Sequence, residues 1–175
     1  MFFGCLIRDI SVHLEYLKAS IEATEAEIQN FTNQTPGLKA KQELLVSIPG
    51  VGKKTSARLL AEIGEINRFE NAPQLAAYAG LNPKGFSSGS SVHKKTRISK
   101  QGRSELRACL YMPAIVAMTH NPVVRALKER LQKKQLPTMA IVAACMRKLL
   151  HIVYGVLKSQ MPFDPDYDRQ FNFSS

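Results

Sequence analysis

Cysteine is scarce in this sequence, and the cysteines that are present show no pairing pattern. Cys5, Cys109 and Cys145 lie far apart, lack a C-x-x-C spacing and are odd in number. We therefore expect reduced thiols in a cytoplasmic protein, and no zinc site. The start, MFFGCLIRD, is too short and too soon charged for a signal peptide. No apolar run is expected to reach the length that spans a membrane.

Acidic residues are also few relative to basic ones. The 175 residues include 24 Lys and Arg against 14 Asp and Glu, a formal net charge of +10. The excess is uneven, because residues 1–35 carry a net −3, whereas residues 82–107 and 122–151 each carry a net +6. This distribution favours a polyanionic partner, although a solvated basic surface would give the same composition.

Strand-like alternation is absent, so the expected class is all-α. From residue 7 to residue 31 apolar side chains recur in steps of three and four, with one polar member. This heptad seam predicts a long helix that self-associates as a coiled coil, or else packs as an ordinary amphipathic helix. Its members are Ile7, Ile10, Leu14, Leu17, Ile21, Thr24, Ile28 and Phe31. The length allows this arm and one small domain.

The remainder is expected to form a helical domain over residues 36–160, with the arm at 1–35 and an irregular tail at 161–175. Two short helices should flank a Pro-Gly-Val-Gly turn at 49–52, and Asn71 and Gly80 should bound another helix. Residues 82–98 are expected to be an exposed loop. Further helices should begin around residue 99, with a kink at Pro113, after Asn121-Pro122, and at Pro137.

The stretch SIPGVGKKTS, residues 47–56, resembles a phosphate-binding loop. A nucleotide P-loop is excluded, because Ser47 stands where its first glycine is needed and Lys54 where Ser or Thr is needed. The spacing instead matches a helix-hairpin-helix, in which Gly50 and Gly52 permit a tight turn. Backbone N–H groups, with Lys53 and Lys54, would then hold a DNA phosphate without reading sequence. Such a hairpin can alternatively serve only to pack helices.

Residues 80–107 combine serine, glycine and basic side chains. A serine hydroxyl attacks a phosphodiester only with cationic charge around the developing phosphorane and a base or metal. By composition alone, such a stretch is more typical of a flexible loop than of a catalytic one. The serines are Ser87, Ser88, Ser90 and Ser91, and they precede His93, Lys94, Lys95 and Arg97.

Several motifs in order, over roughly residues 40–158, resemble one family. They are Pro-Gly-Val-Gly, AAYAGLNP, SSG, ISKQGRSELR and AIVAACMRKLL. Together they are similar to the C-terminal domain of insertion-sequence transposases related to the Piv DNA invertase. These are serine-containing, RNA-guided recombinases with an N-terminal RNase-H-like domain and a coiled-coil arm.

The resemblance implies that Ser88, or failing that Ser87, attacks DNA and forms a covalent phosphoserine link. It places Arg97, Lys100, Arg103 and Arg107 near DNA or a guide RNA. It leaves the role of Arg147 and Lys148 open between helix packing and phosphate contact.

The family's four metal-binding carboxylates are missing from this sequence. Mg²⁺ is expected in the N-terminal domain, and no metal in this chain, because the spacing of Asp164, Asp166 and Asp168 does not match an EF-hand. The chain alone is therefore expected to bind nucleic acid without completing recombination, as a fragment or a truncated reading frame. The rival interpretations are a non-catalytic helix-hairpin-helix nucleic-acid-binding module and an assembly adaptor built on the arm.

Overall fold

The computed structural model describes the backbone of residues 2–88 and 92–166, and the side chains of residues 7–83 and 98–166. Within these residues the chain has seven α-helices, which confirms the helical class, and one two-stranded antiparallel sheet. The chain divides into two compact units, residues 1–40 and 41–175. The predicted arm falls within the first.

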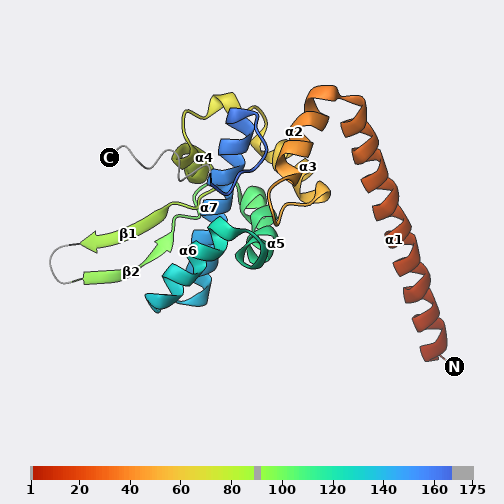
Figure 1. The fold of residues 1–175 in the computed structure, drawn as a ribbon. Coiled ribbons are helices and arrows are strands. Elements are labelled where there is room, and N and C mark those ends of the chain that lie inside the picture. The colour runs from red at the N-terminus through yellow and green to blue at the C-terminus, as the bar shows by residue number, and fades with distance from the viewer. Residues whose placement is uncertain (1, 89–91, 167–175) are drawn as a thin grey trace. The chain divides into compact units, whose positions relative to one another are not determined.

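The elements follow one another along the chain as drawn in Figure 1. They are α1 (Phe2–Gln34), α2 (Pro36–Val46), α3 (Lys53–Ile63), the 3₁₀ helix η1 (Ile66–Arg68), α4 (Ala72–Tyr78), β1 (Pro83–Ser88), β2 (Val92–Ile98), α5 (Ser104–His120), α6 (Pro122–Lys133) and α7 (Thr138–Ser159).

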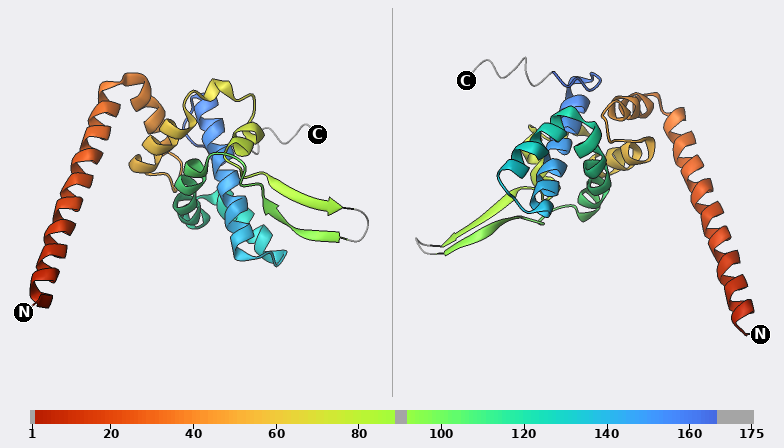
Figure 2. Two further views of the ribbon diagram at one scale, coloured as in Figure 1. Left: turned by 180° about the vertical axis from the view of Figure 1, so that it is seen from behind. Right: turned by 60° about the horizontal axis from the view of Figure 1, so that its bottom comes forward.

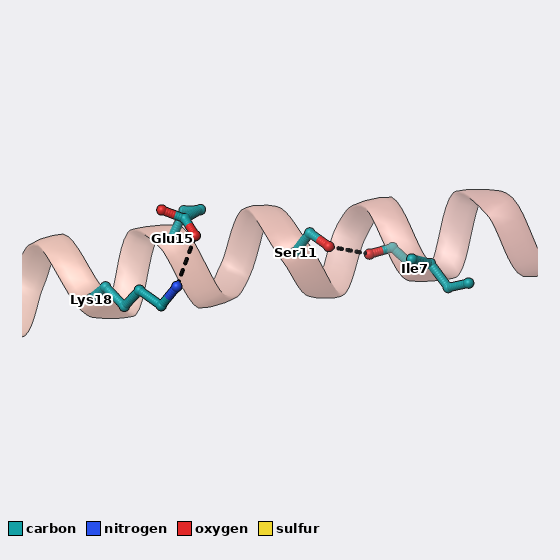
Figure 3. Close-up of polar contacts among 4 residues, drawn as sticks. All are labelled: Ile7, Ser11, Glu15 and Lys18. Carbon is teal, nitrogen blue, oxygen red and sulfur yellow. Dashed lines mark hydrogen bonds and ion pairs between the residues drawn. The ribbon is translucent and has the colours of Figure 1, made fainter.

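The first unit consists of α1 and the beginning of α2. The apolar members of the predicted seam on α1 have 41% to 65% of their surface exposed. Two polar contacts near the start of the helix are local: the Ser11 hydroxyl donates to the Ile7 carbonyl at 2.9 Å, and Lys18 pairs with Glu15 at 3.0 Å (Figure 3). An exposed pair of this kind contributes only about 0.3–0.5 kcal/mol. The apolar seam therefore lies uncovered in the single chain.

In the second unit α7 is the central helix. It contacts η1, α4, α5 and α6, and α3 contacts α5 (Figures 1 and 2). Leu149, Leu150 and Val153 of α7 are fully buried, as are Leu106 and Leu110 of α5. Burial of such a side chain stabilises the fold by about 1.5–3 kcal/mol. These helices form the core from which the loops and the hairpin extend.

Three predicted helix ends are confirmed. The Asn71 side chain accepts a hydrogen bond from the Gln74 amide at 2.9 Å at the start of α4. The buried Asn121 side chain accepts from the amides of Val123 and Val124 at 3.1 and 3.2 Å at the start of α6. Gly80 follows α4 with a φ of +69°, the left-handed conformation that glycine adopts most readily.

Two expectations about the middle of the chain are wrong. Residues 82–98 do not form a loop throughout, because most of them lie in the antiparallel strands β1 and β2. Helix α5 begins at Ser104 rather than near residue 99, because residues 99–103 form backbone hydrogen bonds at the base of the hairpin. Helix α5 then continues through Pro113.

The expectation about apolar runs also needs correction. The 22-residue helix α7 contains an 18-residue segment with a mean hydropathy of 1.6, so it is long and apolar enough to cross a membrane by length and composition. Half of that segment is buried inside the unit. Because its apolar residues contact α4, α5 and α6, the composition of α7 is accounted for by its position in the core.

Candidate nucleic-acid interface

The connection between α2 and α3 is closed against α5. Ile48 is fully buried and Val51 is 4% exposed, so both apolar residues of the turn enter the core. Gly50 has a φ of +104°, and a Cβ placed there would lie 2.9 Å from both the Ala117 Cβ and the Pro113 carbonyl oxygen. Gly50 is therefore required for close packing as well as for the turn.

Gly52 has a different environment. It is exposed, has an ordinary extended conformation, and a Cβ there would meet no atom within 4 Å. It is the N-cap of α3 and supplies no side-chain acceptor to the helix. The first amides of a helix lack intrahelical acceptors, and the positive end of the helix dipole lies there. An anion can therefore approach this helix end without steric obstruction from residue 52.

Two lysines and a pair of buried polar side chains define the beginning of α3. Lys53 and Lys54 are exposed. The Lys53 carbonyl accepts hydrogen bonds from the Ser56 hydroxyl at 2.8 Å and from the Gln42 amide at 3.2 Å. Gln42 belongs to α2, and both Gln42 and Ser56 are buried. The buried amide of Gln42 therefore fixes α2 to the first turn of α3, the turn that carries the lysines.

The serine-rich stretch forms a β-hairpin that projects from the helices of its unit (Figures 1 and 2). Ser88 is the last residue of β1 and is opposite Val92, and Ser87 is opposite His93. The register is irregular between Lys84 and Phe86. Of the other predicted site residues, Lys94, Lys95 and Arg97 lie on β2, whereas Ser90 and Ser91 fall outside the described residues.

The base of the hairpin is held by a short network of backbone hydrogen bonds. The Ser99 amide donates to the Asn82 carbonyl at 2.9 Å, and the Lys100 amide donates to the Gly80 carbonyl at 3.1 Å. The Arg103 amide donates to the Tyr78 carbonyl at 2.9 Å. The segment leaving β2 is therefore attached to the end of α4.

The three basic residues in this segment have different environments. Lys100 is exposed and adopts a left-handed φ of +55°. Arg103 forms an ion pair with Glu62 of α3 at 3.2 Å. The half-buried Arg107 donates from Nη1 to the carbonyls of Ala79 at 3.0 Å and Gly102 at 3.4 Å. The structure thus gives Arg103 and Arg107 partners within the chain.

The basic pair on α7 is partly enclosed. Arg147 and Lys148 are both half-buried, and the Arg147 Nε is a buried atom without a hydrogen-bond partner. Lys148 lines a cavity of about 300 Å³ between α7 and the segment that follows it, together with Val123 and His151. The aliphatic stems of Arg147 and Lys148 therefore contribute to packing.

The described residues contain no group of three or more His, Cys, Asp or Glu side chains placed to hold a metal ion. Of the acidic trio, Asp164 accepts a hydrogen bond from the Asp166 amide at 2.9 Å, and Asp168 lies outside the described residues. Cys109 and Cys145 are free and buried. Burial raises the pKa of the Cys109 thiol and raises that of Cys145 to about 11.

Sequence reasoning missed the residues that hold the site in place. They are Glu62 and Gln42, which belong to no motif, and Gly102, and each acts through a partner elsewhere in the sequence. Gly102 stands inside the basic motif ISKQGRSELR, where a glycine indicates a backbone constraint. That glycine was the one available signal.

Comparison with known proteins identifies related sequences. A family model described as the transposase IS116/IS110/IS902 family matches residues 42–129. The pilin gene-inverting protein of Moraxella bovis is 40% identical over 153 residues, which cover 87% of this chain and 48% of that protein.

Two further relatives are more distant. An uncharacterised 43.6 kDa protein of insertion element IS110 from Streptomyces coelicolor is 29% identical over 136 residues, 78% of this chain and 32% of that protein. A probable family 20 transposase from Pseudomonas aeruginosa is 27% identical over 167 residues, 93% of this chain and 47% of that protein. The chain spans half or less of the length of these curated relatives.

Proposed function

Since the chain belongs to the IS116/IS110/IS902 transposase family, we propose that its second unit binds DNA and supplies the serine nucleophile for strand cleavage and transfer. The observation that carries this proposal is the position of Ser88, at the end of β1 in a hairpin that projects from a helical unit. A nucleophile on such a projection can reach a phosphodiester in a duplex that the helices do not enclose.

The first part of the proposal is that the beginning of α3 binds the DNA backbone, as one half of a helix-hairpin-helix. Lys53 and Lys54 are exposed there, and the open surface at Gly52 allows a phosphate oxygen close to the helix end. These contacts hold DNA without selecting its sequence. Lys94, Lys95 and Arg97 extend the same role along β2, and Lys100 extends it in the segment that follows.

The second part is the chemistry of Ser88. Its Oγ attacks the phosphorus of a DNA phosphodiester, so a bond forms between Oγ and phosphorus while the bond to a deoxyribose oxygen breaks. The serine proton goes to a base, and the departing oxygen takes up a proton to become a free hydroxyl. Cations on β2 would stabilise the negative charge that develops on the phosphoryl oxygens.

Mg²⁺ enters this proposal only with carboxylates that this chain does not supply. The described residues offer no cluster of acidic or other ligands for it. The family resemblance implies a set of acids in an RNase-H-like domain, whose bound Mg²⁺ would supply Lewis-acid chemistry. A guide RNA is a further partner in this proposal.

The test of the nucleophile is a covalent protein–DNA adduct on a denaturing gel. The chain is combined with a matching acidic domain, Mg²⁺ and a DNA substrate. We expect an adduct with the wild-type chain and with the neighbouring control Ser87→Ala, and none with Ser88→Ala. An adduct that survives in Ser88→Ala but disappears in Ser87→Ala would move the nucleophile to Ser87. No adduct with any chain, despite DNA binding, would favour a non-catalytic binding module.

The proposed binding of the DNA backbone by α3 is tested by the salt dependence of DNA affinity. Each phosphate contact that is lost should reduce the slope of log K against log salt by about 1. We expect this change for Lys53→Gln and Lys54→Gln. The matched control is Lys133→Gln on α6, another exposed lysine of the same unit. Equal slopes for the α3 variants and the control would refute the proposal that α3 binds the DNA phosphates.

We also propose that the arm self-associates through the apolar seam on α1. The exposure of that seam in the single chain supports the proposal, because two such faces would cover each other. Leu17→Asp and Ile21→Asp should convert the dimer or larger assembly to monomers in sedimentation equilibrium. Val12→Asp is the matched control, since Val12 is 64% exposed but lies off the seam. Loss of assembly in the control as well would contradict the seam.

A further inference from the structure

Arg107 joins two segments that are separated by the whole hairpin. Its guanidinium donates to the Ala79 carbonyl at the end of α4 and to the Gly102 carbonyl just before α5. The bond to the Ala79 carbonyl is partly buried and so partly shielded from competing water, whereas the longer bond to the Gly102 carbonyl is exposed. Arg107 therefore holds together the points where the chain enters and leaves the hairpin.

The two glycines beside Arg107 show how tightly this region is built. A Cβ at Gly102 would lie 2.3 Å from the Tyr78 carbonyl oxygen, and one at Gly80 would lie 2.7 Å from the Arg107 Nη1. Both glycines have positive φ, +144° and +69°. The base of the hairpin thus accommodates the guanidinium and the two backbone segments, but no side chain at residue 80 or 102.

The ion pair between Arg103 and Glu62 extends the connection to α3. Helix α3 begins with Lys53 and Lys54, the residues proposed to hold the DNA backbone. The base of the hairpin is therefore connected on one side to α4 through Arg107 and on the other side to the DNA-holding helix through Arg103. Because the hairpin and the proposed DNA-binding residues are attached to the same helix, the direction of the hairpin is fixed relative to the proposed position of the DNA.

We propose that Arg107 is a positioning residue, which fixes the base of the β1–β2 hairpin and thereby sets where Ser88 is presented. This rests on the proposed function of Ser88 as nucleophile. A six-residue strand is about 20 Å long at about 3.3 Å per residue, so a rotation of about 3° at its base moves its end by about 1 Å. A displacement of about 1 Å from the attacking geometry can lower a rate about 100-fold.

The structural part is tested without DNA, by the distance between two spin labels. The labels are attached in a Cys5→Ser background at Thr96→Cys on β2 and Glu129→Cys on α6, and labelled chains are diluted with unlabelled ones. We expect a narrow distance distribution, at least twofold wider in Arg107→Gln. The matched control, Arg125→Gln, removes an exposed arginine from α6 and should leave the width unchanged.

A conservative variant separates positioning from a general loss of folding. Arg107→Lys keeps the charge but lacks the planar fork, so its distribution should be wider than wild type and narrower than that of Arg107→Gln. Helix content by circular dichroism verifies that the variants are folded. If Arg107→Gln does not fold, the test rests on Arg107→Lys alone. A distance distribution as narrow as that of the wild type, in Arg107→Gln or, if that variant does not fold, in Arg107→Lys, would overturn the proposal.

The functional part is read from the adduct assay with the acidic domain and Mg²⁺. Arg107→Gln should lower the rate of adduct formation about 100-fold while DNA affinity stays within about twofold of wild type. Equal losses of affinity and rate would make Arg107 a DNA contact and overturn its positioning role. If the wild-type chain forms no adduct, the proposed function fails, and the spin-label distances still decide whether Arg107 fixes the hairpin.

Discussion

Gly50 and Gly52 provide a matched pair of substitutions within one turn. In Gly50→Ala the backbone must hold an L-residue at a φ of +104°, which costs about 1–3 kcal/mol. The new methyl group must also displace the Pro113 carbonyl or Ala117, each 2.9 Å away, and overpacking of this kind costs about 1–3 kcal/mol. The expected loss of stability is about 2–6 kcal/mol, a large part of the total for a small domain.

Gly52→Ala is the control, because its backbone is extended and a Cβ there meets nothing within 4 Å. Alanine is a poorer N-cap than glycine, so we expect a loss below about 1 kcal/mol. Urea unfolding followed by circular dichroism, at one fixed protein concentration, gives the free energy of unfolding of each variant. A loss for Gly50→Ala no larger than that for Gly52→Ala would refute the packing of this turn against α5.

Two further predictions concern the core. Asn121→Ala should lower the free energy of unfolding by about 1–2 kcal/mol, because it removes the acceptor for two amides of α6, whereas Asn121→Ser keeps an acceptor and should lose less. Equal losses in urea unfolding would contradict the capping role. With its pKa at about 11, the Cys145 thiol should be only about 0.1% ionised at pH 8, against about 10% for a pKa of 9.0. Because the thiol is also fully buried, its reaction with a disulfide reagent at pH 8 should be at least about 100-fold slower than in the urea-unfolded chain; a rate within about tenfold of that of the unfolded chain would contradict this prediction.

The sequence by itself predicted the helices with strong local signals. Apolar periodicity identified α1, and the side chains of Asn71 and Asn121 identified the starts of α4 and α6, because a cap acts on amides only two or three residues away. The order of the motifs also predicted the family. Each of the helix signals is contained in a short segment of chain.

The hairpin was not predicted, because glycine, proline and lysine are depleted in strands and no apolar alternation runs through residues 83–98. The roles of Arg103 and Arg107 were equally beyond local reasoning. An arginine in a basic motif has the same sequence signature whether it meets a phosphate or a buried carbonyl. Only the tertiary structure showed which groups of the chain itself these side chains meet, because it brought Glu62 to Arg103 and the end of α4 to Arg107, across 41 and 28 residues of chain.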